Sequence, residues 1–234
     1  MCTVTFIPSG KNFFITSNRD ESPGRRAEHL HTAQSEKEVI HFPLDEASGG
    51  SWIALSDKGR CACLLNGAFE AFVPAPSYRL SRGLITLEAL RAEDYVSFME
   101  DFDLDQIAPF TLLHFDRHNL YELIWDGEQR HISHMDPAVA HIWSSVTLYP
   151  PEIRRNRSLH FENWISQIPA PDREAIISFH LMSHGDPHND FVMNRNEIVR
   201  TLSITNVSFL ETESSILHYE LETGKREVII AAYA

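Results

Sequence analysis

The stretch that decides the fold is CTVTFIPSGKNFFITSNRDE, residues 2–21. It holds two runs rich in β-branched and aromatic residues, 2–7 and 13–17, and the turn-forming residues of 8–12 separate them. Such an arrangement predicts an antiparallel β-hairpin. Because successive side chains of a strand point to opposite faces, the even-numbered residues of the first run, which begin with Cys2, share one side of the sheet.

The second run ends in a concentration of polar groups, Ser17-Asn18-Arg19-Asp20-Glu21. The hairpin folds residues 17–20 back beside Cys2, so these side chains can surround the chain terminus. There, Asp20 can bind or orient an α-ammonium group, and Arg19 can stabilise a thiolate or bind a substrate carboxylate through two hydrogen bonds. The alternative is a charged, solvated loop that follows the hairpin.

Cys2 gives the terminus a chemistry of its own. Methionine aminopeptidases remove Met1 when the second side chain is small, as it is here, and the chain then begins with a thiol and an α-amine on one residue. An α-amine titrates near pH ~8 and can act as the general base for its own thiol. A strand that starts at Cys2 also holds the terminus in place. We therefore expect Cys2 to be a nucleophile; the alternative is a small residue that merely follows the initiator.

The rest of the chain alternates blocks of hairpins with blocks of helices. A second hairpin is expected over 51–66, with its turn at Asp57-Lys58-Gly59. The polar residues 21–48 are predicted to form a long loop. Further strands are expected over 110–115, 120–125, 129–133 and, three in number, 199–233; helices are expected over 80–90, 93–102, 151–167 and 171–182. Antiparallel hairpins with helices inserted in blocks indicate an α+β fold.

Composition limits the classes of function. The 234 residues, of which 43% are hydrophobic, suit one domain spanning 1–234. The net charge of -13 argues against nucleic-acid partners and against anionic membrane surfaces. No apolar run approaches the roughly 18–20 residues of a transmembrane helix, and the first residues lack the features of a signal peptide. We therefore expect a cytoplasmic protein. Of the three cysteines, Cys61 and Cys63 are expected to be small core residues.

Several short motifs, taken together, resemble the NRDE family, also called the transport and Golgi organisation type. They are Met1-Cys2-Thr3-Val4, Asn18-Arg19-Asp20-Glu21, Gly49-Gly50-Ser51-Trp52-Ile53-Ala54-Leu55, Lys58-Gly59-Arg60, Leu65-Asn66 and Ser81-Arg82-Gly83. That family is similar in turn to the choloylglycine hydrolase and penicillin V acylase group of N-terminal nucleophile hydrolases. The resemblance implies a four-layer αββα sandwich, in which two antiparallel sheets pack face to face with helices outside.

The resemblance also implies roles for single residues. Cys2 matches the nucleophile of the acylases, and Asp20 matches the Asp that contacts the terminal amine. Asn66, which closes the strand 60–66, matches the Asn that donates to the oxyanion hole. Such a donor contributes about 3–4 kcal/mol to lowering the barrier in well-studied cases.

At two positions the chain departs from the acylase pattern. Ser17 stands where the acylases have Arg, and the arginine here is Arg19, which follows Asn18. Because adjacent residues of a strand point to opposite faces, Arg19 need not reach the same place. Ser145 stands where the acylases have Asn, and a hydroxyl donates with a different geometry. The predicted catalytic set is therefore Cys2, Asn18, Arg19, Asp20 and Asn66.

Other motifs give weaker indications. Histidines are densest over 180–190, where His180 and His184 are spaced as zinc ligands on a helix can be. No Glu stands in the place that an HExxH motif requires and Gly185 breaks the helix, so we favour a polar helix end and predict no metal. The arginines of 154–157 form a basic patch, which we expect to be a solvated helix face. The chain has neither a GxGxxG motif nor a P-loop, and we predict no cofactor.

Two functions follow from the sequence. The first is a cysteine amidohydrolase that cleaves a linear, non-peptide C–N bond of a small molecule, with Cys2 as nucleophile. The second is a non-catalytic ligand-binding or trafficking protein, lipid- or haem-related, on the same fold, because a fold does not fix function. The substrate remains open, as does the oligomeric state, homo-oligomers included.

Overall fold

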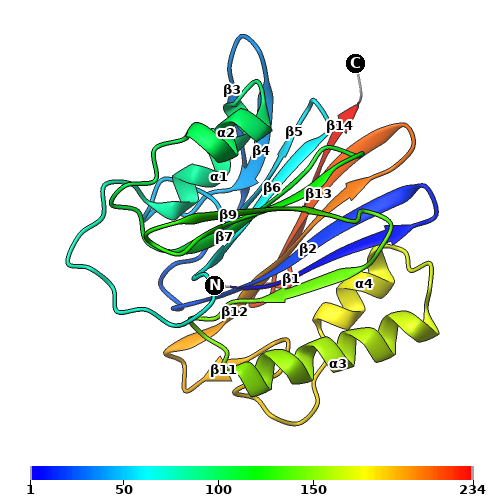
Figure 1. The fold of residues 1–234 in the computed structure, drawn as a ribbon. Coiled ribbons are helices and arrows are strands. Elements are labelled where there is room, and N and C mark those ends of the chain that lie inside the picture. Colours follow the sequence, from blue (N-terminus) through cyan, green and yellow to red (C-terminus); the bar gives the residue numbers. More distant parts are fainter. Residues whose placement is uncertain (1, 233–234) are drawn as a thin grey trace.

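A computed structural model of the protein describes residues 2–232, with side chains from residue 3 to residue 231. Two seven-stranded antiparallel sheets, here called sheet A and sheet B, pack face to face (Figure 1). In spatial order, sheet A holds β10 (His141–Ser144), β1 (Cys2–Ser9), β2 (Asn12–Glu21), β12 (Val199–Phe209), β13 (Glu213–Glu220) and β14 (Arg226–Ala232), with β11 (Asn194–Arg195) paired to β12.

Sheet B is a meander in which each strand pairs with the next along the chain. Its strands are β3 (Leu30–Gln34), β4 (Val39–Pro43), β5 (Ile53–Ser56), β6 (Arg60–Asn66), β7 (Phe110–Phe115), β8 (Leu120–Trp125) and β9 (Arg130–Met135). The predicted turn at 57–59 joins β5 to β6, and Gly59 has a φ of 71°, which favours glycine. The second hairpin is therefore confirmed.

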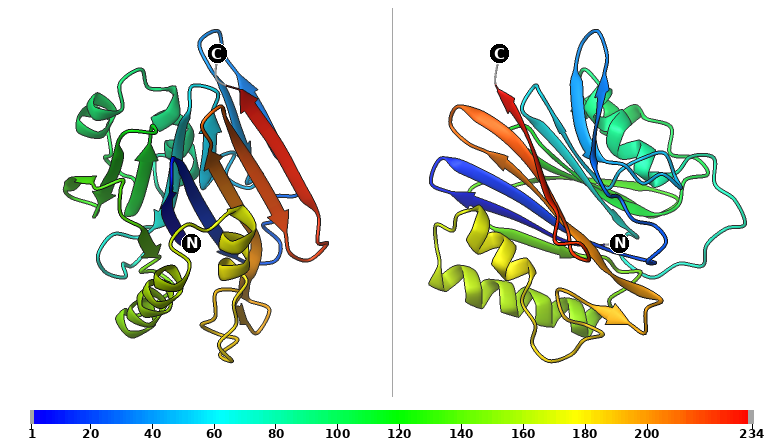
Figure 2. Two further views of the ribbon diagram at one scale, coloured as in Figure 1. Left: turned by 90° about the vertical axis from the view of Figure 1, so that its right-hand side faces the viewer. Right: turned by 180° about the vertical axis from the view of Figure 1, so that it is seen from behind.

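In the described part of the chain, four helices cover the outer faces of the two sheets (Figure 2). Helices α1 (Arg82–Arg91) and α2 (Tyr95–Asp101) lie on sheet B, and α3 (Pro151–Gln167) and α4 (Arg173–His180) lie on sheet A. Helix α3 begins at the residue where the sequence predicts its start, because proline suits the first position of a helix.

Three hydrophobic clusters fill the spaces between these four layers. One lies between the sheets and contains Val4 and Phe6 of β1 together with Cys61 and Cys63 of β6, all without exposed surface. The second lies between sheet B and α1–α2, and the third between sheet A and α3–α4. Fully burying one large apolar side chain contributes about 1.5–3 kcal/mol. The α+β class, the αββα order of layers and the core placement of both internal cysteines are confirmed.

The structure differs from the sequence predictions in three places. The predicted loop 21–48 contains β3 and β4. The apolar, buried sequence of β4 could have indicated a strand, whereas β3 is an edge strand with a polar, largely exposed sequence and gives no alternation. The short strand β10 was not predicted. Strand β2 continues to Glu21, so the polar group after 17 lies in the strand and not in the charged loop that the sequence left as an alternative.

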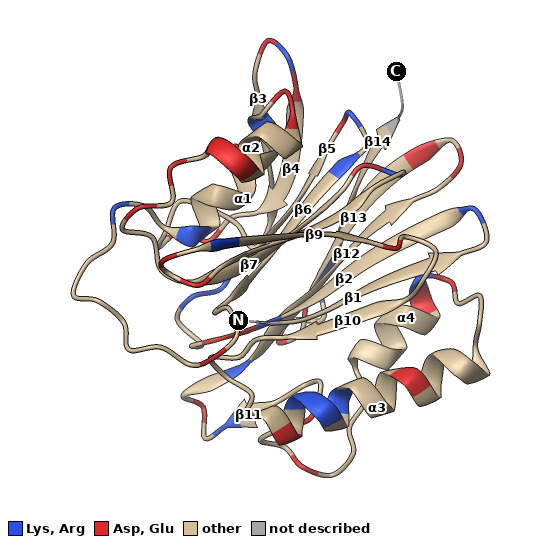
Figure 3. Cartoon of the chain, viewed as in Figure 1, with Lys and Arg blue, Asp and Glu red and all other residues tan. Residues whose placement is uncertain are grey.

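Charged residues gather at strand ends, in loops and on the outer helices, and the strand centres are largely uncharged (Figure 3). Within residues 2–232, no helix is both long enough and apolar enough to cross a membrane.

Candidate active site

The register of the first hairpin fixes the surroundings of the chain terminus. Cys2 is the first residue of β1, and its Cα lies opposite that of Arg19 in β2. On the other side of β1, Thr3 pairs with Ser144 of β10. The predicted meeting of residue 2 with residues 17–20 is therefore present in the backbone. The side chain of Cys2 lies outside the described residues, and its role as nucleophile stays a prediction.

Arg19 points into the space between the sheets and is only 4% exposed. One Nη atom donates to the Asp45 carboxylate at 3.0 Å, and the guanidinium lies 4.1 Å from the ring centroid of Trp52. Arg25 also forms an ion pair with Asp45. Burial raises the pKa of Asp45, but the two arginines more than offset this and hold it below its usual value. Arg19 is thus fixed in the face of sheet A that carries its pairing partner Cys2.

Asp20 points to the opposite face of β2 and has no exposed surface. The Tyr149 hydroxyl donates to Oδ2 at 2.6 Å, and the Thr201 hydroxyl donates to Oδ1 at 2.7 Å. Burial raises the pKa of Asp20, although Arg157 and the two hydroxyl donors favour its charged form. A carboxylate has about four acceptor sites, so both oxygens keep capacity for a further donor.

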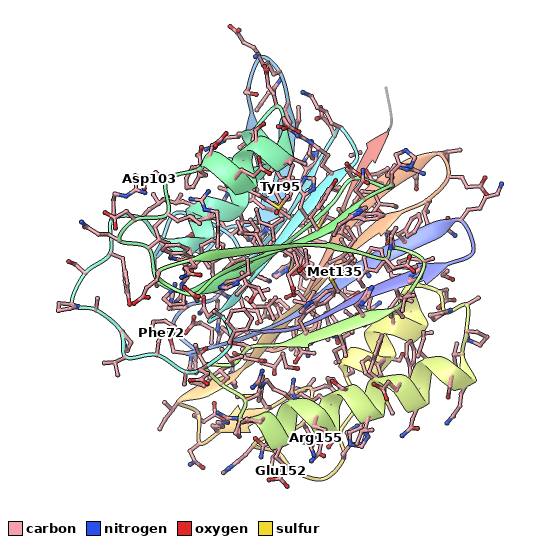
Figure 4. The ribbon with its side chains drawn as sticks, in the orientation of Figure 1. Phe72, Tyr95, Asp103, Met135, Glu152 and Arg155 are labelled. Atoms are coloured by element: carbon pink, nitrogen blue, oxygen red, sulfur yellow. The ribbon has the colours of Figure 1, made fainter. Side chains whose placement is uncertain are left out.

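The predicted basic patch on α3 is not a single solvated face. Arg155 points away from the sheets (Figure 4). The side chain of Arg157, by contrast, is only 2% exposed and points from α3 toward sheet A. The Arg157 guanidinium lies 3.8 Å from the Tyr149 ring and donates to Thr3 Oγ1 and to the carbonyls of Asn189, at 3.1 Å, and Asp190, at 2.5 Å. Its neighbours are therefore those of Asp20, and its role is to hold α3, β1 and the loop after α4 together.

Asn18 shares the outer face with Asp20 and joins sheet A to α4. Its Nδ2 donates to the carbonyls of His180, at 3.0 Å, and Phe191, at 2.7 Å, and its Oδ1 is hydrogen-bonded to His180 Nδ1. The other ring nitrogen of His180 is bonded to Thr5 Oγ1 at 2.8 Å. The amide of Asn18 is therefore committed to the scaffold.

His180 also corrects the prediction of a polar helix end, because this last residue of α4 is fully buried. Burial lowers the pKa of His180 to about 3. His184 lies in the following loop and stacks on His160. Among the described residues, no group of three or more His, Cys, Asp or Glu is placed to hold a metal ion.

Asn66 ends β6 on the facing sheet and borders two cavities. The first, of about 80 Å³, we call the polar cavity; its lining includes Arg19, Asp45, Trp52, Asn66, Arg82 and Gly83. The second, of about 270 Å³, we call the larger cavity; its lining includes Leu65, Asn66, Phe69, Ile124, Trp143 and Ser144. Strand β1 therefore begins between β2, which contributes Arg19 to one cavity, and β10, which contributes Ser144 to the other.

Ser145, where the acylase pattern has Asn, holds the Asn66 segment in place. Its hydroxyl donates to the Asn66 carbonyl at 2.8 Å and is bonded to Thr147 Oγ1 at 2.9 Å. Ser145 is only 2% exposed and belongs to the lining of the larger cavity, where it holds the Asn66 carbonyl.

Two glycine motifs meet at the polar cavity. A Cβ atom placed on Gly50 would lie 2.3 Å from the carbonyl carbon of Gly83, and Ser51 N donates to Gly83 O at 3.0 Å. Only glycine allows this approach, which brings the first turn of α1 against the start of β5. The Gly49–Leu55 and Ser81–Gly83 motifs are therefore two sides of one contact.

The structure brings together only some of the predicted site residues. Arg19 and Asn66 line one cavity, while Asn18 and Asp20 lie on the other face of sheet A. Sequence reasoning missed Tyr149 and Thr201, which are 129 and 181 residues from Asp20 along the chain. No local pattern could have revealed such contacts.

Solved structures share this architecture. The N-acylethanolamine-hydrolyzing acid amidase ortholog of Caenorhabditis elegans superposes with a TM-score of 0.62 at 8% identity, covering 88% of this chain and 92% of that chain. A variant of the conjugated bile acid hydrolase of Clostridium perfringens gives a TM-score of 0.55 at 9% identity, covering 97% and 92%. No curated protein matches in sequence.

The chain shares the fold of these two hydrolases, an αββα sandwich. Within it, the chain belongs to the Transport and Golgi organisation 2 family, whose model matches residues 1–223. The resemblance found in the N-terminal motifs is thereby confirmed over most of the sequence.

Proposed function

We propose that this protein is a cysteine amidohydrolase that cleaves a linear, non-peptide C–N bond, with Cys2 as nucleophile after removal of Met1. The observation that carries the proposal is the position of residue 2. It starts the strand that lies between the two cavities, it pairs with Arg19, and Asn66 of the facing sheet borders both cavities. By their names, one of the two structural neighbours above is an acid amidase and the other a hydrolase of conjugated bile acids, which supports a hydrolase reaction.

The proposed reaction proceeds in two steps. The α-amine of Cys2 takes the proton of the thiol, the sulfur bonds to the amide carbonyl carbon, and Asn66 donates to the oxyanion. The C–N bond then breaks, the amine leaves with the proton, and a thioester remains. Water attacks the thioester, releasing the carboxylic acid and restoring the thiol. Asp20 orients the α-amine from its buried position.

Mass spectrometry of protein expressed in its native host tests the proposal. We expect the loss of Met1, followed by one covalent adduct when the protein meets a thiol-reactive acyl probe. Burial raises the pKa of the Cys61 thiol, which keeps it protonated and unreactive, so peptide mapping must place the adduct on Cys2. Cys2→Ser must abolish it. Retention of Met1 on the native protein would falsify the catalytic assignment.

One observation favours the second candidate, a ligand-binding protein on the same fold. Among the described residues, the buried hydroxyl of Ser17 has no hydrogen-bond partner, whereas the acylases have an arginine at that place. If ligand binding is the whole function, Cys2→Ser leaves the affinity for the ligand unchanged, and no turnover is detected with either protein. With either function, we propose that residues 1–234 form a single domain and that the protein is cytoplasmic.

A further inference from the structure

The polar cavity contains an excess of hydrogen-bond donors and positive charge. Three guanidinium groups, those of Arg19, Arg25 and Arg82, line it together with the carboxylates of Glu21 and Asp45. Arg19 and Arg25 form ion pairs with Asp45, and Arg25 also pairs with Glu21. Within the described part of the chain, Arg82 forms no ion pair.

Arg82 is held in place without being neutralised. Its Nη1 donates to the carbonyl of Pro109 at 3.0 Å, and its guanidinium lies 5.9 Å from the ring of Phe72, on the loop labelled in Figure 4. Burial lowers the pKa of Arg82 to about 10, which shows that its charged form is incompletely solvated. An anion beside it would restore that stabilisation.

Three further donors on residues that line this cavity have no partner among the described residues. They are the buried Nε atoms of Arg19 and Arg25 and the Nε1 atom of Trp52, and Arg19 and Trp52 are each only 4% exposed. None of these groups can accept a hydrogen bond, so each needs an acceptor. The first turn of α1, Ser81–Gly83, lines the cavity too; it has no acidic residue and no side-chain cap. A helix start of this kind favours an anion.

We propose that the polar cavity binds a carboxylate of the substrate, so that the substrate is an amide with an apolar part and an anionic group close to the scissile bond. The hydrolysis of such a substrate rests on the proposed function, whereas the binding of its carboxylate does not. One water needs on the order of 10–15 Å³, so a cavity of about 80 Å³ holds a group the size of a carboxylate.

The larger cavity takes the apolar part. Leu65, Phe69, Ile124 and Trp143 contribute to its lining beside polar side chains that include Glu122 and Arg154, and its volume of about 270 Å³ exceeds that of the polar cavity, about 80 Å³, several-fold. Asn66 borders both, so a ligand that extends from one cavity into the other passes this amide. A carboxylate and an alkyl chain on opposite sides of an amide describe an N-acyl amino acid.

Equilibrium binding to the Cys2→Ala protein tests the assignment without turnover. The probes are N-octanoylglycine and its neutral methyl ester, measured by isothermal titration calorimetry. The ester lacks the charge that strengthens hydrogen bonds to the arginine, so the acid should bind about tenfold more tightly than the ester, or better. Arg82→Gln should remove this preference and leave the affinity for the ester unchanged.

Two further variants make the result decisive. Arg91→Gln removes the same charge at the exposed end of the same helix and must change neither affinity. Arg82→Lys keeps the charge without the planar fork, and must bind the acid more weakly than Arg82 does but still prefer it to the ester. Equal binding of acid and ester, or an unchanged preference in Arg82→Gln, overturns the assignment. A preference for the acid in a protein that hydrolyses nothing refutes the proposed function alone.

Discussion

Asp20 has no exposed surface, and the groups around it decide its charge. Two hydroxyl donors and the nearby guanidinium of Arg157 favour the carboxylate, while burial opposes it. Because the two donors come from distant parts of the sequence, the ionisation of this residue depends on the whole outer side of sheet A. The proposed role of Asp20 in orienting an α-amine requires the ionised form.

Tyr149→Phe tests this dependence. The change removes the 2.6 Å hydrogen bond to Asp20 and leaves the ring in place under Arg157. The variant should lose about 1–3 kcal/mol of its free energy of unfolding, measured by urea denaturation at neutral pH. Because the lost donor favours the charged form, the pKa of Asp20 should rise, and labelling of Cys2 by an acyl probe should fail at a higher pH than in the wild type.

The control is Tyr219→Phe on β13. It makes the same chemical change at a half-buried tyrosine, whose ring lies 4.6 Å from the Arg226 guanidinium. Its stability should stay within about 0.5 kcal/mol of the wild type. An equal loss in both variants, or an unmoved pH limit in Tyr149→Phe, would show that Asp20 does not depend on Tyr149.

At the scale of elements, β2 serves two sites because its residues alternate. Arg19 faces sheet B, whereas Asn18 and Asp20 face α3 and α4.

The hairpin that brings β2 beside Cys2 could be predicted from the sequence, because a turn between two apolar runs is a local signal. The partners of each side chain could not, because β12 and Tyr149 come from far along the chain. The edge strand β3 was missed because its exposed, polar sequence gives no periodic signal.

Gly50→Ala tests the contact that joins two elements at the polar cavity. The added methyl group would lie 2.3 Å from the backbone of Gly83, and a backbone atom cannot move aside as a side chain can. We expect a loss of about 1–3 kcal/mol in the free energy of unfolding, together with weaker binding of any ligand of this cavity.

Gly24→Ala is the matched control for this contact, since a Cβ atom there meets nothing within 4 Å. Its stability should equal or slightly exceed that of the wild type, because alanine reduces the entropy of the unfolded chain. If Gly50→Ala were as stable as Gly24→Ala in urea denaturation, the close approach of the two motifs would not contribute to the free energy of unfolding.

At the scale of the whole molecule, the two outer layers each enclose a neutral histidine. His180 is the buried last residue of α4, His114 of β7 lies under α2, and burial lowers the pKa of both to about 3. The His180 ring is hydrogen-bonded at both nitrogens, but neither nitrogen of His114 has a partner among the described residues. The His114 ring stacks instead on Tyr95 of α2, at 3.6 Å between centroids; Tyr95 is labelled in Figure 4.

His114→Phe therefore separates packing from protonation. In the unfolded chain, histidine takes up a proton below pH 6.5, whereas folded His114 stays neutral down to about pH 3. The unfolded state thus binds more protons, and stability falls as the pH drops through this window, by about 1.4 kcal/mol per unit for each such group. Phenylalanine fills the same stacked position and takes up no proton. Relative to the wild type, the variant should gain about 2 kcal/mol of stability between pH 7.5 and pH 5, measured by urea denaturation at both values.

His134→Phe, the same change at an exposed position of β9, must show no such gain on acidification. If both variants respond alike, the acid sensitivity of the fold does not originate in the layer beneath α2.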